Sequence, residues 1–186
     1  MNKYRDKNDY VKLPEIPTSF VDELNSLEFT RENPIKGLET IYGYMNKYNS
    51  IIKQVAVCEK GCSFCCYVDV SITDLEARYI SEKTHHKIKN LHRITLGYFG
   101  KKCPFLSDSN ECSIYDSRPF HCRTLHALDD PKYCKTNESH QIYGTADPRI
   151  SPRYGSNILE RTKKAIDFLD NHKQIRDIRD FFGTSL

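Results

Sequence analysis

The chain has 186 residues, which fits one domain that is large enough to bury a modest core. Its 28 basic and 25 acidic residues leave a formal net charge of +3, an excess too small to indicate a nucleic-acid-binding surface. No segment approaches the roughly 18 consecutive apolar residues of a membrane-spanning helix, and the charged start lacks the apolar stretch of a secretory signal, so we expect a cytoplasmic protein without membrane or nucleic-acid partners.

Helices are expected after a charged, proline-containing arm over residues 1–17. A short helix is predicted over about 19–29. Asn33 followed by Pro34 is a good helix start, because the Asn side chain can accept a backbone N–H and the proline lacks an N–H that would be unpaired there. Apolar residues then recur at intervals of three and four up to Ile52, which predicts an amphipathic helix whose apolar face packs in the core.

The middle of the chain differs, because residues 58 to about 154 lack the apolar periodicity of a long helix. A short extended segment is expected over 68–70. Thr73 and Glu76 have the spacing of a capping box, in which each side chain accepts the other's backbone N–H, and this predicts a helix to about Lys83. Prolines and glycines from residue 129 onward are typical of a loop.

Two further helices are expected near the C-terminal end, one with an apolar face over 158–169 and a second that includes Ile175 and Phe181. The predicted fold class is therefore mainly α: a single domain with helical flanks around an irregular cysteine-rich core that binds metal. We expect an N-terminal arm and helices over 1–54, the cysteine core over 55–135, and a loop with helices over 136–186, in one compact unit.

Cysteine is the residue type that stands out, because all eight cysteines lie in the middle of the chain. In a reducing compartment an even number does not imply disulfides, and the thiolates remain available for metal. A disulfide-stapled secreted domain is the alternative, and the missing signal speaks against it. The candidate metal ligands are Cys58, Cys62, Cys65, Cys66, Cys103, Cys112, Cys122 and Cys134.

The cysteine spacing predicts loops that direct several sulfurs at one ion about 2.3 Å away. Gly61 helps, since it allows the positive φ that such a turn often needs. The cysteines form two clusters, the first over 58–66 and the second over 103–122. Neither cluster alone offers four ligands that are well spaced, so the two clusters should be neighbours in space. Adjacent side chains diverge, so Cys65 and Cys66 should not both bind one ion. Either the cysteines serve two sites, or one site takes four and the rest are spare thiols.

Basic residues beside the cysteines suggest a supporting shell, since nearby cations favour the thiolate. Arg118 and Arg123 are expected to hold the loops, whereas Lys60, Lys101 and Lys102 are expected to be ordinary surface residues. His121 should point away from the direction that its neighbour Cys122 takes.

Several motifs together resemble a known family, the CxxCxxCC or YkgJ-type cysteine-cluster proteins. They are Cys62-x2-Cys65-Cys66 preceded by Cys58, Thr73-x2-Glu76, Cys103-Pro-Phe-Leu, Cys112-Ser-Ile-Tyr and Arg118-Pro-x2-Cys122-Arg123. The resemblance spans about residues 55–125 and implies a zinc- or iron-chelating domain of bacterial type. A flagellin lysine N-methylase is similar in its cysteine pattern. Cys134 lies outside the pattern, so its replacement is expected to matter less.

A radical S-adenosylmethionine enzyme is a competing interpretation, because Cys58-x3-Cys62-x2-Cys65 is the spacing with which such enzymes hold a [4Fe–4S] cluster. The rest of the chain disagrees: it lacks alternating strands and helices, and no two of its glycines are adjacent. We therefore do not expect the fold of a radical S-adenosylmethionine enzyme, but an iron–sulfur cluster remains an alternative to zinc.

Three functions remain in view. The first is a structural or chelating protein that binds zinc or iron, with a [4Fe–4S] cluster among the iron forms. The second is an enzyme that uses its metal or cluster in redox chemistry or protein lysine N-methylation. The third is a zinc-stabilised module whose loops bind a protein partner. The sequence itself names no reaction.

Overall fold

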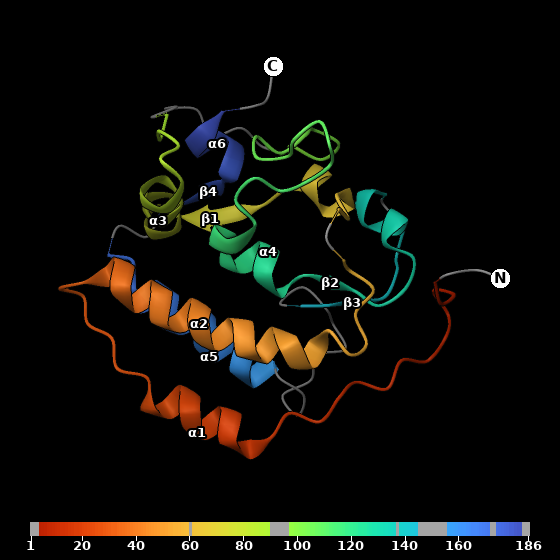
Figure 1. The fold of residues 1–186 in the computed structure, drawn as a ribbon, viewed down its shortest axis with the longest axis horizontal. Coiled ribbons are helices and arrows are strands. Elements are labelled where there is room, and N and C mark those ends of the chain that lie inside the picture. Colours follow the sequence, from red (N-terminus) through yellow and green to blue (C-terminus); the bar gives the residue numbers. More distant parts are fainter. Residues whose placement is uncertain are drawn as a thin grey trace.

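The computed structural model describes residues 4–59, 61–89, 97–136, 138–144, 156–171 and 174–183, without the side chains of Ser156 and Asn157. Two helices form the base of the molecule: α2 (Pro34–Ile52) and α5 (Ser156–Leu169) pack on each other, and α1 (Thr18–Ser26) packs on α5 (Figure 1). The irregular cysteine-containing segments lie on the opposite side of α2 from α1.

Helix α2 forms as its sequence predicts. The Asn33 side chain accepts the Lys36 N–H, and Pro34 is the first helical residue. The predicted apolar face is buried, with Leu38, Ile41 and Met45 at 0% exposure. Gly37 lets α5 approach closely, because a Cβ at that position would lie 2.8 Å from the Leu169 side chain.

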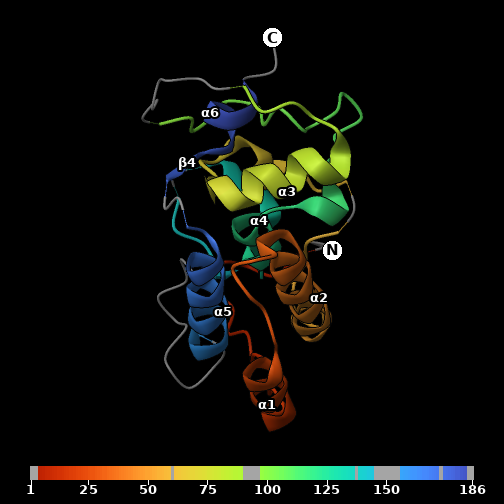
Figure 2. The ribbon, with the colours of Figure 1, turned by 90° about the vertical axis from the view of Figure 1, so that its left-hand side faces the viewer.

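Helix α3 (Asp74–Thr84) separates two apolar cores and lies between α6 and the base helices (Figure 2). Its predicted capping box is confirmed: Glu76 N–H donates to Thr73 Oγ1 at 3.2 Å, and Thr73 N–H donates to the Glu76 carboxylate at 2.9 Å. Leu75 belongs to the core shared with α2 and α5, whereas Ile80 belongs to the core shared with α6 and the cysteine loops. The cysteine region is therefore packed onto the scaffold through α3.

Two short antiparallel strand pairs tie distant segments together. Strand β1 (Ser71–Thr73) pairs with β4 (Ile175–Asp177), and β2 (His126–Ala127) pairs with β3 (Ile142–Tyr143). The extended segment expected over 68–70 leads into β1. The predicted helix that includes Ile175 is not observed at that residue, because Ile175 lies in β4 and pairs with Thr73. Helix α6 (Ile178–Phe182) begins only after Asp177, whose side chain caps it. Long-range strand pairing prevails here over local apolar spacing.

The remaining elements of the described residues are short. They are the 3-10 helices η1 (Phe64–Tyr67), η2 (Tyr115–Ser117) and η3 (Pro131–Lys135), and helix α4 (Phe120–Thr124). The fold class, mainly α around an irregular middle, is confirmed. Most of the loop expected before residue 154, namely 145–155, lies outside the described residues. Within the described part, no helix has the length and apolar character needed to cross a bilayer.

The Glu76 carboxylate is a buried polar hub, with 2% of the residue exposed. Besides the Thr73 N–H, it accepts the Tyr42 hydroxyl from α2 at 2.8 Å and the Phe120 N–H from α4 at 2.7 Å. One side chain of α3 thus joins α2 to the start of the helix that carries Cys122. Such a group costs free energy to bury unless its partners are all present.

We predict that Glu76→Ala lowers the free energy of unfolding by about 3 kcal/mol, because a buried hydroxyl and two N–H groups lose their acceptor. Urea denaturation in reducing buffer measures this change. Glu82→Ala, at an exposed position of the same helix, is the matched control and should cost under about 0.5 kcal/mol. Equal stability of the two variants would contradict the role assigned to Glu76.

Candidate metal centre

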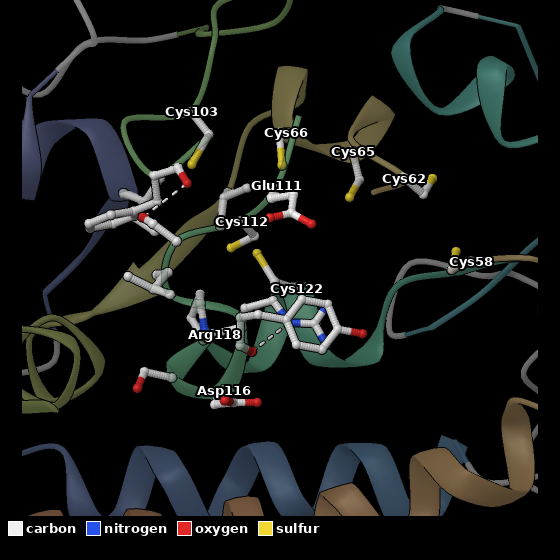
Figure 3. A pocket seen from close by; sticks show the side chains of 18 of the residues that line it. Cys58, Cys62, Cys65, Cys66, Cys103, Glu111, Cys112, Asp116, Arg118 and Cys122 are labelled. Atoms are coloured by element: carbon white, nitrogen blue, oxygen red, sulfur yellow. Dashed lines mark hydrogen bonds between the residues drawn. The ribbon is translucent and has the colours of Figure 1, made fainter. Parts of the chain in front are cut away.

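Both cysteine clusters open onto one cavity of about 840 Å³ (Figure 3). The structure thus brings together residues that are far apart in the sequence, as the spacing predicts. Cys103 is buried and the other cysteines are partly buried. The cysteines that line the cavity are Cys58, Cys62, Cys65, Cys66, Cys103, Cys112 and Cys122.

Backbone hydrogen bonds join the two clusters directly. The first cluster turns at Gly61, whose φ of +89° is the positive value that the sequence predicts. It continues into η1, where the Cys66 carbonyl accepts the Cys103 N–H at 2.8 Å. The next residue, Tyr67, accepts the Gly100 N–H at 2.7 Å. The loop that precedes the second cluster is therefore fixed along η1.

Backbone N–H groups also donate to the sulfurs. Ala127 N–H in β2 lies 3.1 Å from Cys58 Sγ. Cys62, Cys103 and Cys112 share a local pattern, in which the donor is the N–H two residues further along the chain. These donors belong to Phe64, Phe105 and Ile114. Each of these bonds favours the thiolate, which is the form that binds metal.

Neighbouring thiols in the first cluster form hydrogen-bonded pairs. The Cys58 thiol donates to Cys62 and lowers the pKa of Cys62 to about 7, while the same bond, together with burial, raises the pKa of Cys58. The Cys66 thiol donates to Cys65 in the same way, which lowers the pKa of Cys65 and raises that of Cys66. Each pair thus holds one thiol that ionises readily beside one that does not.

Burial dominates for the other cysteines. It raises the pKa of Cys103 to about 11 and of Cys134 to about 12, and it raises the pKa of Cys112 and Cys122 as well. Several thiolates cannot gather in such a site without compensating positive charge. A soft metal cation supplies this compensation and releases the thiol protons as it binds.

The two arginines hold the cysteine loops, as expected. Arg118 lines the cavity, stacks 3.7 Å over the Tyr115 ring, and lowers the pKa of Cys65, Cys112 and Cys122 against the effect of burial.

Arg123 is buried at 3% exposure, and it donates to the Asn46 side chain of α2 at 2.8 Å and to the Arg118 carbonyl at 2.5 Å. It also donates to the Asp116 carbonyl, and its own carbonyl accepts from Asn49 of α2. The segment that carries Cys122 is therefore anchored on α2.

Arg179 is a supporting residue that the sequence did not reveal. It lies in α6 at 0% exposure and donates to the carbonyls of Cys66 at 3.3 Å and Lys101 at 2.7 Å. Asp177 balances its charge at 3.0 Å. Arg179 thus ties the backbone of η1 to the loop that leads into Cys103. The only sequence signal is an arginine among the apolar residues of a short helix.

His121, Lys101 and Lys102 do not line the cavity onto which the cysteines open. His121 lines a separate cavity of about 170 Å³ with Thr73 and Ile175, so it points away from the direction of Cys122 as expected. Lys101 is exposed and Lys102 pairs with Asp108, which agrees with their expected surface role. Lys60 lies outside the described residues.

The donor chemistry fits zinc or iron, because soft thiolates suit both metals. The ligand geometry is not preformed: among the described residues, no three Cys, His, Asp or Glu side chains are grouped closely enough to hold one ion as they stand. Binding therefore requires the sulfurs to move inward from the walls of the cavity. Thiols that are hydrogen-bonded to one another and set on short loops can make such a shift.

We predict that Arg179→Lys lowers the free energy of unfolding by at least about 2 kcal/mol, because lysine keeps the charge but lacks the planar fork that serves several carbonyls. It should also make Cys103 react faster with a thiol reagent in the metal-free protein. Arg78→Lys, at an exposed position of α3, is the control. If both variants match the parent in stability and thiol reactivity, Arg179 does not hold these loops.

Comparison with known proteins supports a metal site in this region. Residues 57–145 match the family model CxxCxxCC, described as "Putative zinc- or iron-chelating domain". The match continues past residue 125, where the resemblance was expected to end, and its range includes Cys134. No curated protein and no solved structure shows a significant match. The part of the chain that holds all eight cysteines is thus a match to the CxxCxxCC family of zinc- or iron-chelating domains.

Proposed function

We propose that the protein binds zinc or iron through its cysteine thiolates, and that the bound metal stabilises the irregular middle of the chain. The observation that carries this proposal is the convergence of seven thiols on one cavity, in a segment that matches a zinc- or iron-chelating family. The ligands are drawn from Cys58, Cys62, Cys65, Cys66, Cys103, Cys112, Cys122 and Cys134.

Either metal suits this donor set. Zinc takes four thiolates in a tetrahedral site, and a [4Fe–4S] cluster is also held by four cysteines. In both forms the net charge of the thiolates exceeds that of the metal centre. Arg118 and the backbone N–H groups aimed at sulfur offset part of this excess. We further propose a cytoplasmic location, where reduced thiols stay available for metal.

The chain's own residues have a definite task in this function. Gly61 and η1 present the first cluster, and Arg179 keeps the backbone of the second cluster beside it. Arg123 and Glu76 fix α4, so Cys122 is held by two contacts to the helical scaffold. The metal closes loops that are distant in sequence, and its binding free energy becomes folding free energy.

The size of the cavity favours a second candidate, a metal-dependent enzyme. Its volume of about 840 Å³ lies within the range of small-molecule sites, roughly 300–1,000 Å³, and an ion fills little of it. Redox chemistry or lysine N-methylation would both use this space. Methylation requires a methyl donor, so calorimetry with S-adenosylmethionine on the metal-loaded protein tests that branch. Absence of binding contradicts methylation and leaves the chelating function intact.

We predict that protein purified without oxygen carries zinc or iron in at least one equivalent per chain, and that Cys62→Ser and Cys122→Ser each lower this content sharply. Serine offers a harder oxygen that ionises poorly, so both metal content and melting temperature should fall. Elemental analysis, the absorption spectrum and thermal unfolding measure these effects. A brown colour indicates iron–sulfur chemistry, and a colourless protein indicates zinc.

Ser109→Ala, at an exposed position of the loop between Cys103 and Cys112, serves as the control and should keep its metal. Full metal occupancy in both cysteine variants would contradict the proposal that these thiolates bind metal. Stability that depends on oxidised cysteine pairs rather than on metal would instead support disulfides.

A further inference from the structure

We infer that the eight cysteines form two separate sites of four thiolates each, which divide between Cys65 and Cys66. The inference rests on the proposed function, since it assumes that thiolates bind metal. The first site consists of Cys58, Cys62, Cys65 and Cys134. The second site consists of Cys66, Cys103, Cys112 and Cys122.

The division begins in η1, where Cys65 and Cys66 are adjacent and their thiols share a hydrogen bond, so the two sites meet at this point. Figure 3 shows Cys65 on the side of Cys62 and Cys58, and Cys66 on the side of Cys103. The backbone agrees with this view, because the Cys66 carbonyl accepts the Cys103 N–H. Apart from the hydrogen bond that they share, the two adjacent cysteines therefore face different partners.

The first site is built from three segments. Cys58 and Cys62 are hydrogen-bonded through their thiols, and Cys65 is close enough to raise the pKa of Cys58 further. Helix η3 packs directly on η1 and brings in Cys134, whose pKa is raised first by burial and then by Cys65 and Cys62. This contact places Cys134, the last cysteine of the chain, near Cys62 and Cys65, and we assign it as the fourth ligand of the first site.

The second site is built from the loop over 103–114 and from α4. That loop folds back on itself, since Leu106 bridges to Cys112 and Ser113 N–H donates to the Phe105 carbonyl at 2.8 Å. This brings Cys112 back towards Cys103.

The mutual effects of the sulfurs agree with this second grouping. Burial and then Cys65 raise the pKa of Cys122 most, and Cys103 and Cys112 raise it further. The hydrogen bond with Cys65 is the largest cause that raises the pKa of Cys66, and Cys103 and Cys122 add to it. Members of the second group thus act on one another, and Cys65 of the first group acts on them as well.

The number of ligands that one metal centre takes favours two sites. One zinc ion or one [4Fe–4S] cluster takes four thiolates, so a single site would leave four thiols, most with a raised pKa, around the same cavity without a role. The two nearby cations do not separate the groups, because Arg179 acts on Cys103 and Arg118 acts on Cys65 as well as on Cys112 and Cys122. Cys65 influences members of both groups, so the two sites adjoin.

Titration of the reduced, metal-free protein with Co²⁺ under argon tests this division, because cobalt replaces zinc in thiolate sites and its absorption bands report sulfur ligation. The parent protein should saturate at two equivalents. Saturation at one equivalent would overturn the two-site inference while leaving the proposed function standing. No thiolate-to-cobalt band in a protein that is folded by circular dichroism would overturn the proposed function itself.

Paired variants test which cysteines share a site. Cys58→Ser with Cys134→Ser removes two ligands of the first site only, so one tetrathiolate cobalt spectrum should remain. Cys134→Ser with Cys112→Ser removes one ligand from each site, so no such spectrum should remain. If both double variants lose the tetrathiolate cobalt spectrum to the same extent, the assignment of cysteines to the two sites is contradicted. The stoichiometry of the parent protein decides the number of sites even if a variant fails to fold.

Discussion

The structure depends on one electrostatic constraint: several thiols are buried around a common space, and thiolates cannot gather there without positive charge. Burial raises the pKa of Cys103, Cys112, Cys122 and Cys134, and paired thiols keep one proton between them in the first cluster. The segments that carry these cysteines consist of turns and short helices, with little apolar periodicity of their own. In the function that we propose, a bound cation satisfies the sulfurs and closes these segments at the same time.

Buried polar side chains, in addition to an apolar core, join the helical scaffold to the cysteine region. Glu76 collects donors from α2 and α4, Arg123 reaches from α4 to α2, and Arg179 reaches from α6 to the backbone on both sides of the cavity. Buried charged groups of this kind specify one arrangement, because each would cost several kcal/mol if its partners moved away. The loops are therefore anchored on the scaffold, although no three Cys, His, Asp or Glu side chains of the described residues are grouped closely enough to hold one ion as they stand.

The sequence predicts those features whose cause is local. The start of α2 at Asn33 and Pro34 and the capping box of Thr73 and Glu76 follow from neighbouring residues, and both are observed. The positive φ of Gly61 belongs to the same class. The meeting of the two cysteine clusters was predictable from coordination chemistry, because neither cluster could supply a complete ligand set.

Features that depend on distant partners could not be predicted. Ile175 has the spacing of a helix residue, yet it joins a strand because β1 lies beside it. Arg179 acts on a carbonyl 113 positions away, and nothing near it in the sequence indicates that contact. The place of Cys134 beside Cys62 and Cys65 likewise follows from the packing of η3 on η1.

Hydrogen exchange of backbone amides, with and without a metal chelator in oxygen-free reducing buffer, tests the central claim most directly. We predict that chelation removes protection from the cysteine segments over 58–67 and 103–136, whereas the amides of α2, α3 and α5 keep theirs, because those helices share an apolar core. Unchanged protection in the cysteine segments after complete removal of metal would contradict the claim that metal holds them together.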